Sequence, residues 1–463
     1  MFTSASLPMT DGRLNRRRSG LWDWLAALSL LLAFALAGWK VWHLPPATSF
    51  AASAPGSVFK TPPATRPASE RSADGRFLLD AQFVSAAPGQ AVHAASMVEL
   101  RDGRLRAVWF SGSREGAGDV TIQTALMDAT TLRWEPERTL FNRQQIERGL
   151  WRYVKKLGNP VIARAPDGSL LLWMVNVSVG GWAGSAITWS RSTDEGVSWS
   201  QPRRLVTSPF LNISTLVKGA PIAMADGQIS LPVYHEFVSK FGEVLRINPQ
   251  GQVIDKVRIP GSQTSLQPVL LVAGPERAQV YMRAGEGGKL VAAATDDAGK
   301  TWSRAHAASL PNPDSALAAL VTPGGTQWLA LNPTAAGRAT LAVLQTSKGG
   351  SFDGVSPWLV EGAGAAPTSL PVADYERLLG KELRARGASE AQAQAYIASA
   401  RRQLCGADNC SQEFSYPYLL QTSDGYIHLL YTWHRTRIKH VQFDPLQTAL
   451  SAKPAVIHVS PAN

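Results

Sequence analysis

Polar side chains able to transfer protons or bind a sugar stand where several short apolar runs end. Arg114 and Glu115 follow one such run, and Glu236 follows another. Alternation along the second run places His235 and Glu236 on opposite faces, so at most one of them lines a shared site. Because loops at strand ends carry binding and catalytic groups, we expect Arg114 and Glu115 to contact a substrate and Glu236 to act as an acid or base. Similar strand ends carry three groups that could bind hydroxyls, Asn159, Lys218 and Asn312.

The composition is that of a globular β protein with an acidic partner. Of 463 residues, 45% are hydrophobic and 17% charged, which argues against a disordered chain. The formal net charge of +11 favours an acidic partner. No run of five or more basic residues occurs, so we expect no nucleic acid. Abundant Trp, Gly and Pro favour a turn-rich sugar-binding protein, in which Trp433 could be a sugar platform or a buried strand end.

The N-terminal segment predicts a membrane anchor. Residues 1–20 carry a basic cluster, and residues 21–44 form a largely apolar stretch with Trp at both ends, long enough for a bilayer. The basic cluster predicts a cytoplasmic N-terminus and an exported remainder. The alternative is a cleaved signal peptide. Residues 45–77, rich in Pro, Ala and Ser, predict an extended linker to one domain at 78–463.

Two eight-residue segments share one turn pattern. Both read hydroxyl, any residue, Asp, any residue, Gly, any residue, hydroxyl, Trp. The Asp accepts backbone N–H bonds, the Gly takes a positive φ, and the Trp packs over the turn. With weaker copies, the turn glycines recur roughly every 50 residues, the size of a propeller blade. The defining residues are Ser192, Asp194, Gly196 and Trp199 in one copy and Thr295, Asp297, Gly299 and Trp302 in the other.

One stretch departs from the strand pattern. Residues 375–403 have helical spacing and strong helix formers, which predicts a helical insertion at about 372–410. The insertion ends near Cys405 and Cys410, which an oxidising compartment would allow to pair. Such a bond would close only a small loop. The insertion could dock the domain on another envelope protein of polysaccharide assembly.

The turn motif resembles the Asp-box of the sialidase superfamily, and the resemblance covers residues 78–463. It implies an all-β, six-bladed β-propeller with a site on the propeller axis. In that superfamily an arginine triad holds the substrate carboxylate, a Glu activates a Tyr nucleophile, and an Asp is the acid or base. Segments at 109–116, 158–161, 231–236 and 431–435 are most similar to bacterial proteins called predicted neuraminidases or BNR-repeat proteins. This implies a single-pass inner-membrane protein with its propeller in the periplasm.

Three residues match the superfamily's site. Tyr416 resembles the nucleophile, and Arg283 and Arg338 resemble two arginines of the triad. A guanidinium suits that role because its planar fork binds a carboxylate with two hydrogen bonds. A phenol has a pKa near 10, so Tyr416 needs a neighbouring base or cation.

Other positions depart from the superfamily pattern. His93 stands where the first triad arginine is expected, and it could be a general base or a core histidine. Gln267 stands where the activating Glu is expected, and a Gln can orient Tyr416 but cannot take its proton. Glu115 and Asp119 loosely match the acid or base.

Three functions therefore remain open. The first is an anchored sialidase-like glycoside hydrolase acting on an acidic or modified sugar of envelope polysaccharide or exopolysaccharide. The second is a polysaccharide lyase that uses His93 and Tyr416 as base and acid. The third is a non-catalytic glycan-binding propeller. We favour the first. Neither a metal nor a cofactor is expected, because no His, Asp or Glu spacing and no Gly-rich phosphate loop points to one.

Overall fold

The computed structural model describes residues 20–42, 48–51, 70–128, 130–208, 212–285, 288–362 and 367–446. The chain divides into two compact units, residues 1–47 and 48–463. The first unit contains helix α1 (Leu21–Trp42). Its residues 21–39 are long and apolar enough to cross a membrane, a property that a signal sequence shares. Twenty-two helical residues extend about 33 Å, close to the hydrocarbon thickness of a bilayer.

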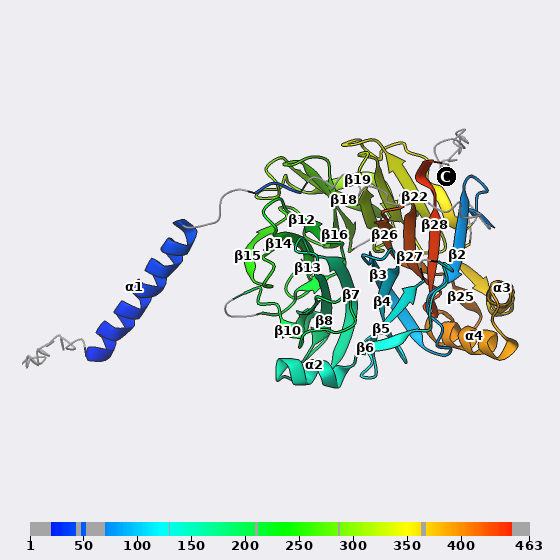
Figure 1. Ribbon diagram of the computed structural model, residues 1–463, viewed down its shortest axis with the longest axis horizontal. Coiled ribbons are helices and arrows are strands. Elements are labelled where there is room, and N and C mark those ends of the chain that lie inside the picture. The colour runs from blue at the N-terminus through cyan, green and yellow to red at the C-terminus, as the bar shows by residue number, and fades with distance from the viewer. Residues whose placement is uncertain are drawn as a thin grey trace, which may run out of the picture. The chain divides into compact units, whose positions relative to one another are not determined.

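Antiparallel sheets, or blades, make up most of the second unit (Figure 1). The first blade contains β3 (Ala91–Glu99), β4 (Leu105–Gly112), β5 (Thr121–Met127) and β6 (Arg138–Phe141). The second contains β7 (Lys156–Arg164), β8 (Leu170–Val177), β9 (Ser185–Ser192) and β10 (Arg203–Arg204). The third contains β11 (Leu216–Val217), β12 (Ile222–Ala223), β13 (Ile229–His235), β14 (Phe241–Ile247) and β15 (Val253–Arg258).

Three more blades complete the ring. The fourth contains β16 (Ser265–Val272), β17 (Ala278–Ala284), β18 (Gly288–Thr295) and β19 (His306–Asn312). The fifth contains β20 (Ala318–Val321), β21 (Gln327–Leu331), β22 (Leu341–Thr346) and β23 (Trp358–Glu361). The sixth contains β26 (Phe414–Gln421), β27 (Ile427–Trp433), β28 (Arg437–Phe443), β2 (Leu78–Phe83) and β1 (Glu70–Arg71). Inner strands of successive blades contact one another, so the fold is a six-bladed β-propeller.

Blade packing explains the apolar runs of the sequence. All eight residues of β8 are buried, because both faces of a blade are covered by its neighbours. The ring is closed by pairing β2 with β28, from Asp80 opposite Gln442 to Phe83 opposite Lys439. The sixth blade therefore combines strands from both ends of the domain.

A short segment ahead of the blades also lies on the propeller. Phe50 is only 1% exposed and forms a β-bridge with Met224. Its N–H donates to the Pro275 carbonyl at 2.7 Å, and the Ala51 N–H donates to the Ala223 carbonyl at 2.9 Å. The phenyl ring belongs to the apolar cluster that contains Trp302. Residues 48–51, which the composition assigns to the linker, therefore contact the third and fourth blades.

Both Asp-boxes form turns after the third strand of a blade. In the first, the Asp194 carboxylate accepts from Ser198 N at 2.9 Å and from Ser192 Oγ at 2.7 Å. The Ser198 hydroxyl and amide are the main cause that lowers the pKa of Asp194 to about 2. In the second box Asp297 makes the matching bonds, and Gly196 and Gly299 have φ of 80° and 82°. Neighbouring strands of a blade run in opposite directions, so the end of the second strand and the end of the third lie at opposite ends of the blade. The Asp-box turns therefore lie at the opposite end of the blades from Arg283, which is near the end of the second strand of the fourth blade.

The helical insertion separates the fifth and sixth blades. It consists of β24 (Ser369–Pro371), α3 (Val372–Ala385), α4 (Glu390–Leu404) and β25 (Asn409–Ser411). β24 pairs with β25, and a disulfide joins Cys405 to Cys410. Ser389 caps α4 in a capping box with Gln392. The apolar faces of α3 and α4 pack into the core cluster of the fifth and sixth blades, so the insertion is part of the propeller's core. Two smaller helices are α2 (Arg143–Leu150) and the 3₁₀ turn Trp182–Gly184.

Candidate functional site

The innermost strands of four blades share one backbone irregularity. Ala94, Asn159, Gln267 and Tyr416 have φ between 39° and 54°, and strand pairing breaks its register at each of them. A β-bulge of this kind re-aims a side chain, and a non-glycine residue held at positive φ is often part of a functional site. The bulges lie at corresponding places in the ring, so they direct side chains toward a common centre.

Three of these side chains are linked by hydrogen bonds through Tyr234. Gln267 Nε2 donates to the hydroxyl oxygens of Tyr416 and Tyr234, each at 3.3 Å. Asn159 Nδ2 donates to the Tyr234 oxygen at 3.1 Å. Burial raises the pKa of Tyr234, so that residue stays a neutral phenol. The Gln267 side chain is 2% exposed, so water does not compete for its amide nitrogen. Both phenol oxygens therefore accept a hydrogen bond from the same buried amide.

Arg283 and Arg338 lie beside this group, held by acidic residues. Arg283, at the end of β17, donates from Nη1 to Gln267 Oε1 at 3.2 Å. Its Nε lies 2.8 Å from Asp314 Oδ1, close enough for an ion pair although the two atoms are not aligned as a hydrogen bond. Arg338, between β21 and β22, donates from Nη2 to the Asp314 carbonyl at 3.0 Å. Its Nη1 lies 3.4 Å from Glu413 Oε1.

Arg435 supplies a third guanidinium from the β27–β28 turn. Its Nε lies 2.9 Å from Glu413 Oε2, and its Nη1 lies 3.0 Å from Glu115 Oε2. Arg283, Arg338 and Arg435, which we call the arginine arc, are therefore joined by shared acidic partners. Their side chains are 12%, 21% and 24% exposed, so all three retain access to solvent.

Glu413 is the fixed counter-ion of the arc. Burial would raise its pKa, but Arg435 and Arg338 outweigh burial and lower the pKa to about 2. Ser415 Oγ donates to Glu413 Oε1 at 2.6 Å. Glu413 is thus a carboxylate at neutral pH, and it holds two arginines in place.

Lys218 and His93 flank the Tyr416 ring. The Lys218 ammonium lies 5.8 Å from the ring centroid and donates to the Pro417 carbonyl at 3.1 Å. Burial lowers the pKa of Lys218 to about 7. The His93 ring centroid lies 4.1 Å from that of Tyr416, and neither of its nitrogens has a hydrogen-bond partner among the described residues. Burial holds the pKa of His93 well below its usual range, so this ring is neutral.

The remaining acidic candidates differ in where they lie. Glu236 interacts with Arg283, and burial is the main cause that raises its pKa. His235 instead pairs with Glu243 at 2.9 Å. Asp119 accepts from Ser113 N and Oγ, both at 3.0 Å, and so ties the loop that carries Glu115. The structure brings Glu115 and Glu236 to the arginine arc, whereas Asp119 bonds within its own loop.

Two further candidates lie outside the arc. Arg114 is exposed on the β4–β5 loop. Trp433 is fully buried between Phe83 and His434, with ring centroids 5.1 Å and 4.5 Å away, so it packs the core and offers no face to a sugar. Among the described residues, no group of three or more His, Cys, Asp and Glu is arranged to hold a metal ion.

Arg435, Glu413 and Tyr234 are site residues that sequence reasoning did not single out. Arg435 and His434 occupy the centre of a tight turn with φ of 53° and 48°. A tight turn with two positive φ angles normally carries Asn or Gly. The only sequence feature that could have pointed to Arg435 is therefore a His-Arg pair at a position where turn residues are expected.

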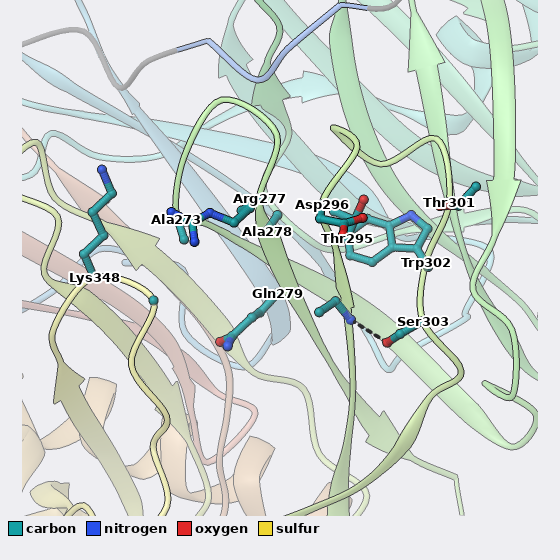
Figure 2. Close-up of a pocket in the computed structure, with 12 residues that line it drawn as sticks. Ala273, Arg277, Ala278, Gln279, Thr295, Asp296, Thr301, Trp302, Ser303 and Lys348 are labelled. Atoms are coloured by element: carbon teal, nitrogen blue, oxygen red, sulfur yellow. Dashed lines mark hydrogen bonds between the residues drawn. The ribbon is translucent and has the colours of Figure 1, made fainter.

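A separate hollow lies at the Asp-box end of the fourth blade, with a volume of about 730 Å³. Figure 2 shows Arg277, Gln279 and Trp302 around it, with the Ala294 N–H donating to Ser303 Oγ at 3.0 Å. None of the residues that line it belongs to the group around Tyr416.

Comparisons with known proteins agree with this architecture. A family model described as a BNR repeat-like domain matches residues 103–429. No curated protein sequence matches the chain. The Hadza microbial sialidase Hz136 has a similar structure, with TM-score 0.56 and 16% identity, covering 77% of this chain and 66% of that one.

Two further structures are similar over nearly their whole length. The intramolecular trans-sialidase of Ruminococcus gnavus, in complex with oseltamivir carboxylate, has TM-score 0.55 and 12% identity, covering 80% of this chain and 97% of that one. A protein of unknown function from Dyadobacter fermentans has TM-score 0.57 and 12% identity, covering 79% and 98%. At these identities the likeness concerns the fold. With the match over residues 103–429, the chain belongs to the BNR repeat-like domain family and has the six-bladed propeller of sialidases.

Proposed function

We propose that the protein is a sialidase-like glycoside hydrolase acting on a carboxylate-bearing sugar of envelope polysaccharide or exopolysaccharide. One observation carries the proposal: three partly exposed guanidinium groups from three blades are joined by shared acidic partners, and two of them lie beside the phenol of Tyr416. Arg283 and Arg435 both interact electrostatically with that phenol. The trans-sialidase of similar fold was solved in complex with oseltamivir carboxylate, which supports a carboxylate-bearing ligand.

The arginine arc is the carboxylate site of this proposal. A guanidinium binds a carboxylate through two parallel N–H bonds and remains charged at any physiological pH. Glu413 and Asp314 hold the arc without closing it, because each shares its oxygens between neighbouring arginines. The substrate carboxylate would add a further negative group to a cluster whose cations are already positioned, so little reorganisation is needed on binding.

Tyr416 is the nucleophile and Glu236 the general acid. The Tyr416 oxygen would attack the anomeric carbon and lose its proton to solvent, while the glycosidic oxygen leaves with the Glu236 proton. Burial favours the protonated form of Glu236, as a general acid requires. Water would then cleave the glycosyl–tyrosine bond, with Glu236 taking the water's proton and the Tyr416 oxygen regaining its proton from solvent. Arg283 and Arg435, which interact with Tyr416, would stabilise the negative charge that develops on its oxygen during the reaction.

A lyase is the second candidate, and Gln267 favours it. This side chain cannot accept the Tyr416 proton, whereas an amide and a guanidinium together can neutralise a uronate carboxylate. In that reaction the neutral His93 would remove the proton next to the carboxylate, and the neighbouring glycosidic oxygen would leave with the proton of Tyr416. The two candidates differ in their products.

The test is mass spectrometry of products from the full-length protein in detergent. It would be incubated with the producing cell's surface polysaccharide and with sialyllactose, beside a Tyr416→Phe variant. Fragments that gain one water, and disappear in the variant, support the hydrolase. Fragments with an unsaturated uronate overturn it in favour of the lyase. No cleavage with retained glycan binding overturns both and leaves the binding propeller.

We also propose that α1 anchors the protein in a bacterial inner membrane, with its N-terminus cytoplasmic and the propeller in the periplasm. The apolar length of α1 and the Cys405–Cys410 disulfide support this placement, because disulfides persist in oxidising compartments. Resistance of the protein to carbonate extraction, with the propeller open to protease in spheroplasts, is the expected result. Recovery of a shortened, soluble chain would favour a cleaved signal peptide.

A further inference from the structure

The turn that carries Arg435 has a strained backbone that must be held by its surroundings. His434 and Arg435 both have positive φ, a conformation that L-residues with side chains rarely adopt. Within the sixth blade, the His434 N–H donates to the Glu413 carbonyl at 2.7 Å, and the Thr436 N–H donates to the Trp433 carbonyl at 3.2 Å. The other contacts to this turn include several from the helical insertion.

Helix α3 reaches the turn through one buried hydroxyl. Tyr375 is 0% exposed, and its Oη lies 3.0 Å from His434 Nδ1. Burial lowers the pKa of His434 to about 3 and raises that of Tyr375, so both are neutral. The Glu413 N–H also points to Nδ1, at 3.5 Å, which makes Nδ1 the acceptor and places the imidazole proton on Nε2. Tyr375 therefore donates to a histidine of fixed tautomer.

Helix α4 contacts the same turn at two further points. Gln403 Nε2 donates to the Arg435 carbonyl at 3.3 Å, and Thr436 Oγ1 donates to the Tyr396 carbonyl at 3.2 Å. The helices are themselves tied to the blades: Lys439 forms ion pairs with Glu361 and with Glu382 of α3.

We propose that the helical insertion is a positioning device for the arginine arc, with Tyr375 and Gln403 as the residues that set where Arg435 presents its guanidinium. The inference rests on the proposed function, because it gives the insertion a role in carboxylate binding. It also explains why Arg435 can stand in a turn without glycine. The insertion holds the backbone of the turn, whereas Glu413 and, from the first blade, Glu115 hold the guanidinium.

The experiment compares two buried hydroxyl deletions in the insertion of the full-length protein. Tyr375→Phe removes the bond to His434. Tyr396→Phe is the matched control, because Tyr396 is 2% exposed and the hydroxyl that it loses donates to the Ala86 carbonyl. The substitution keeps the main-chain carbonyl and the ring of residue 396, which contact Thr436 and Arg437. Hydrogen exchange of peptides covering residues 433–437 is expected to be about three- to ten-fold faster in Tyr375→Phe and unchanged in the control.

Calorimetry then tests the consequence for binding, with N-acetylneuraminate and glucuronate and their methyl esters as probes. Tyr375→Phe should lower the preference for acid over ester by about three- to ten-fold, while the control keeps it. The inference is overturned if Tyr375→Phe leaves the hydrogen exchange of the turn unchanged. It is also overturned if the wild type prefers the acid to the ester and Tyr375→Phe keeps the same preference. A wild type with no such preference would instead refute the proposed function, and the exchange data would still decide whether the insertion holds the turn. If Tyr375→Phe does not fold, Gln403→Ala carries the same two measurements.

Discussion

Replacing Gln267 by Glu tests directly whether Tyr416 is a nucleophile. The substitution keeps the shape of the side chain and changes an amide into a carboxylate. The Nε2 atom that it replaces lies 3.3 Å from the Tyr416 oxygen, so a carboxylate oxygen there is within reach of the phenol proton. The Oε1 atom already accepts from Arg283 at 3.2 Å, so the new charge has a partner.

The size of the effect follows from these contacts. A positioned general base contributes about 10²- to 10⁴-fold in rate, and we expect a kcat increase of about 100-fold because the contact is at the long end of the useful range. Gln267 is only 2% exposed, and burying a charge there costs free energy that the Arg283 ion pair only partly returns. We therefore expect the free energy of unfolding to fall by about 1–3 kcal/mol.

The assay is release of the leaving group from an aryl glycoside of an acidic sugar, with urea unfolding measured on the same protein. The Gln267→Glu gain should disappear when Tyr416→Phe is added, which separates base catalysis from a general change in the site. A folded Gln267→Glu protein with unchanged or lower kcat would refute the assignment of Tyr416 as nucleophile. Complete loss of turnover would point to Gln267 as a carboxylate-neutralising group of a lyase.

Three further perturbations have defined outcomes. Arg435→Gln should raise KM for an acidic substrate by about ten- to hundred-fold, as expected for a lost charged hydrogen bond. Arg104→Gln, which removes only the exposed ion pair of Arg104 with Asp102, should leave KM unchanged. For Lys218, whose folded pKa of about 7 lies below the ordinary 10.5, the unfolded chain binds the extra proton between these values. The free energy of unfolding should therefore rise with pH from about 7 to 10.5, and urea titrations of Lys218→Met should lack that rise. Replacing Cys405 and Cys410 by Ser should lower the free energy of unfolding by about 2 kcal/mol, the value for so small a loop, and a reductant should reproduce the loss in the wild type.

Local chemistry made much of the fold predictable. The Asp-box turns depend on bonds within eight residues, as in Asp194 to Ser198, so their pattern is visible in the sequence and its period gives the blades. The helical insertion is equally local, because the spacing of apolar residues defines both α3 and α4 and a capping box begins α4. The burial of Phe50 depends instead on apolar residues of the third and fourth blades that are distant in the sequence, so no local pattern predicts it.

The candidate site was predictable only where a side chain matches a known position. The structure brings Tyr416, Gln267 and Arg283 together, and the sequence had marked all three. Arg435 escaped notice because its place in the arc depends on a hairpin with two positive-φ residues. Asp119 is the opposite case, a residue that the sequence marked but that lies outside the arginine arc. Its position resembles that of the catalytic acid or base, but its carboxylate accepts hydrogen bonds from the hydroxyl and the amide of Ser113.

The closing of the ring by β2 and β28 has a consequence for when the protein becomes functional. The strand that completes the sixth blade is made early, whereas β26, β27 and β28 are made last, so their pairing spans almost the whole domain. Contacts of such long sequence separation form slowly. The same blade carries Tyr416, Glu413 and Arg435. A chain still in synthesis therefore has no arginine arc, and the three guanidinium groups come together only with the last folding step.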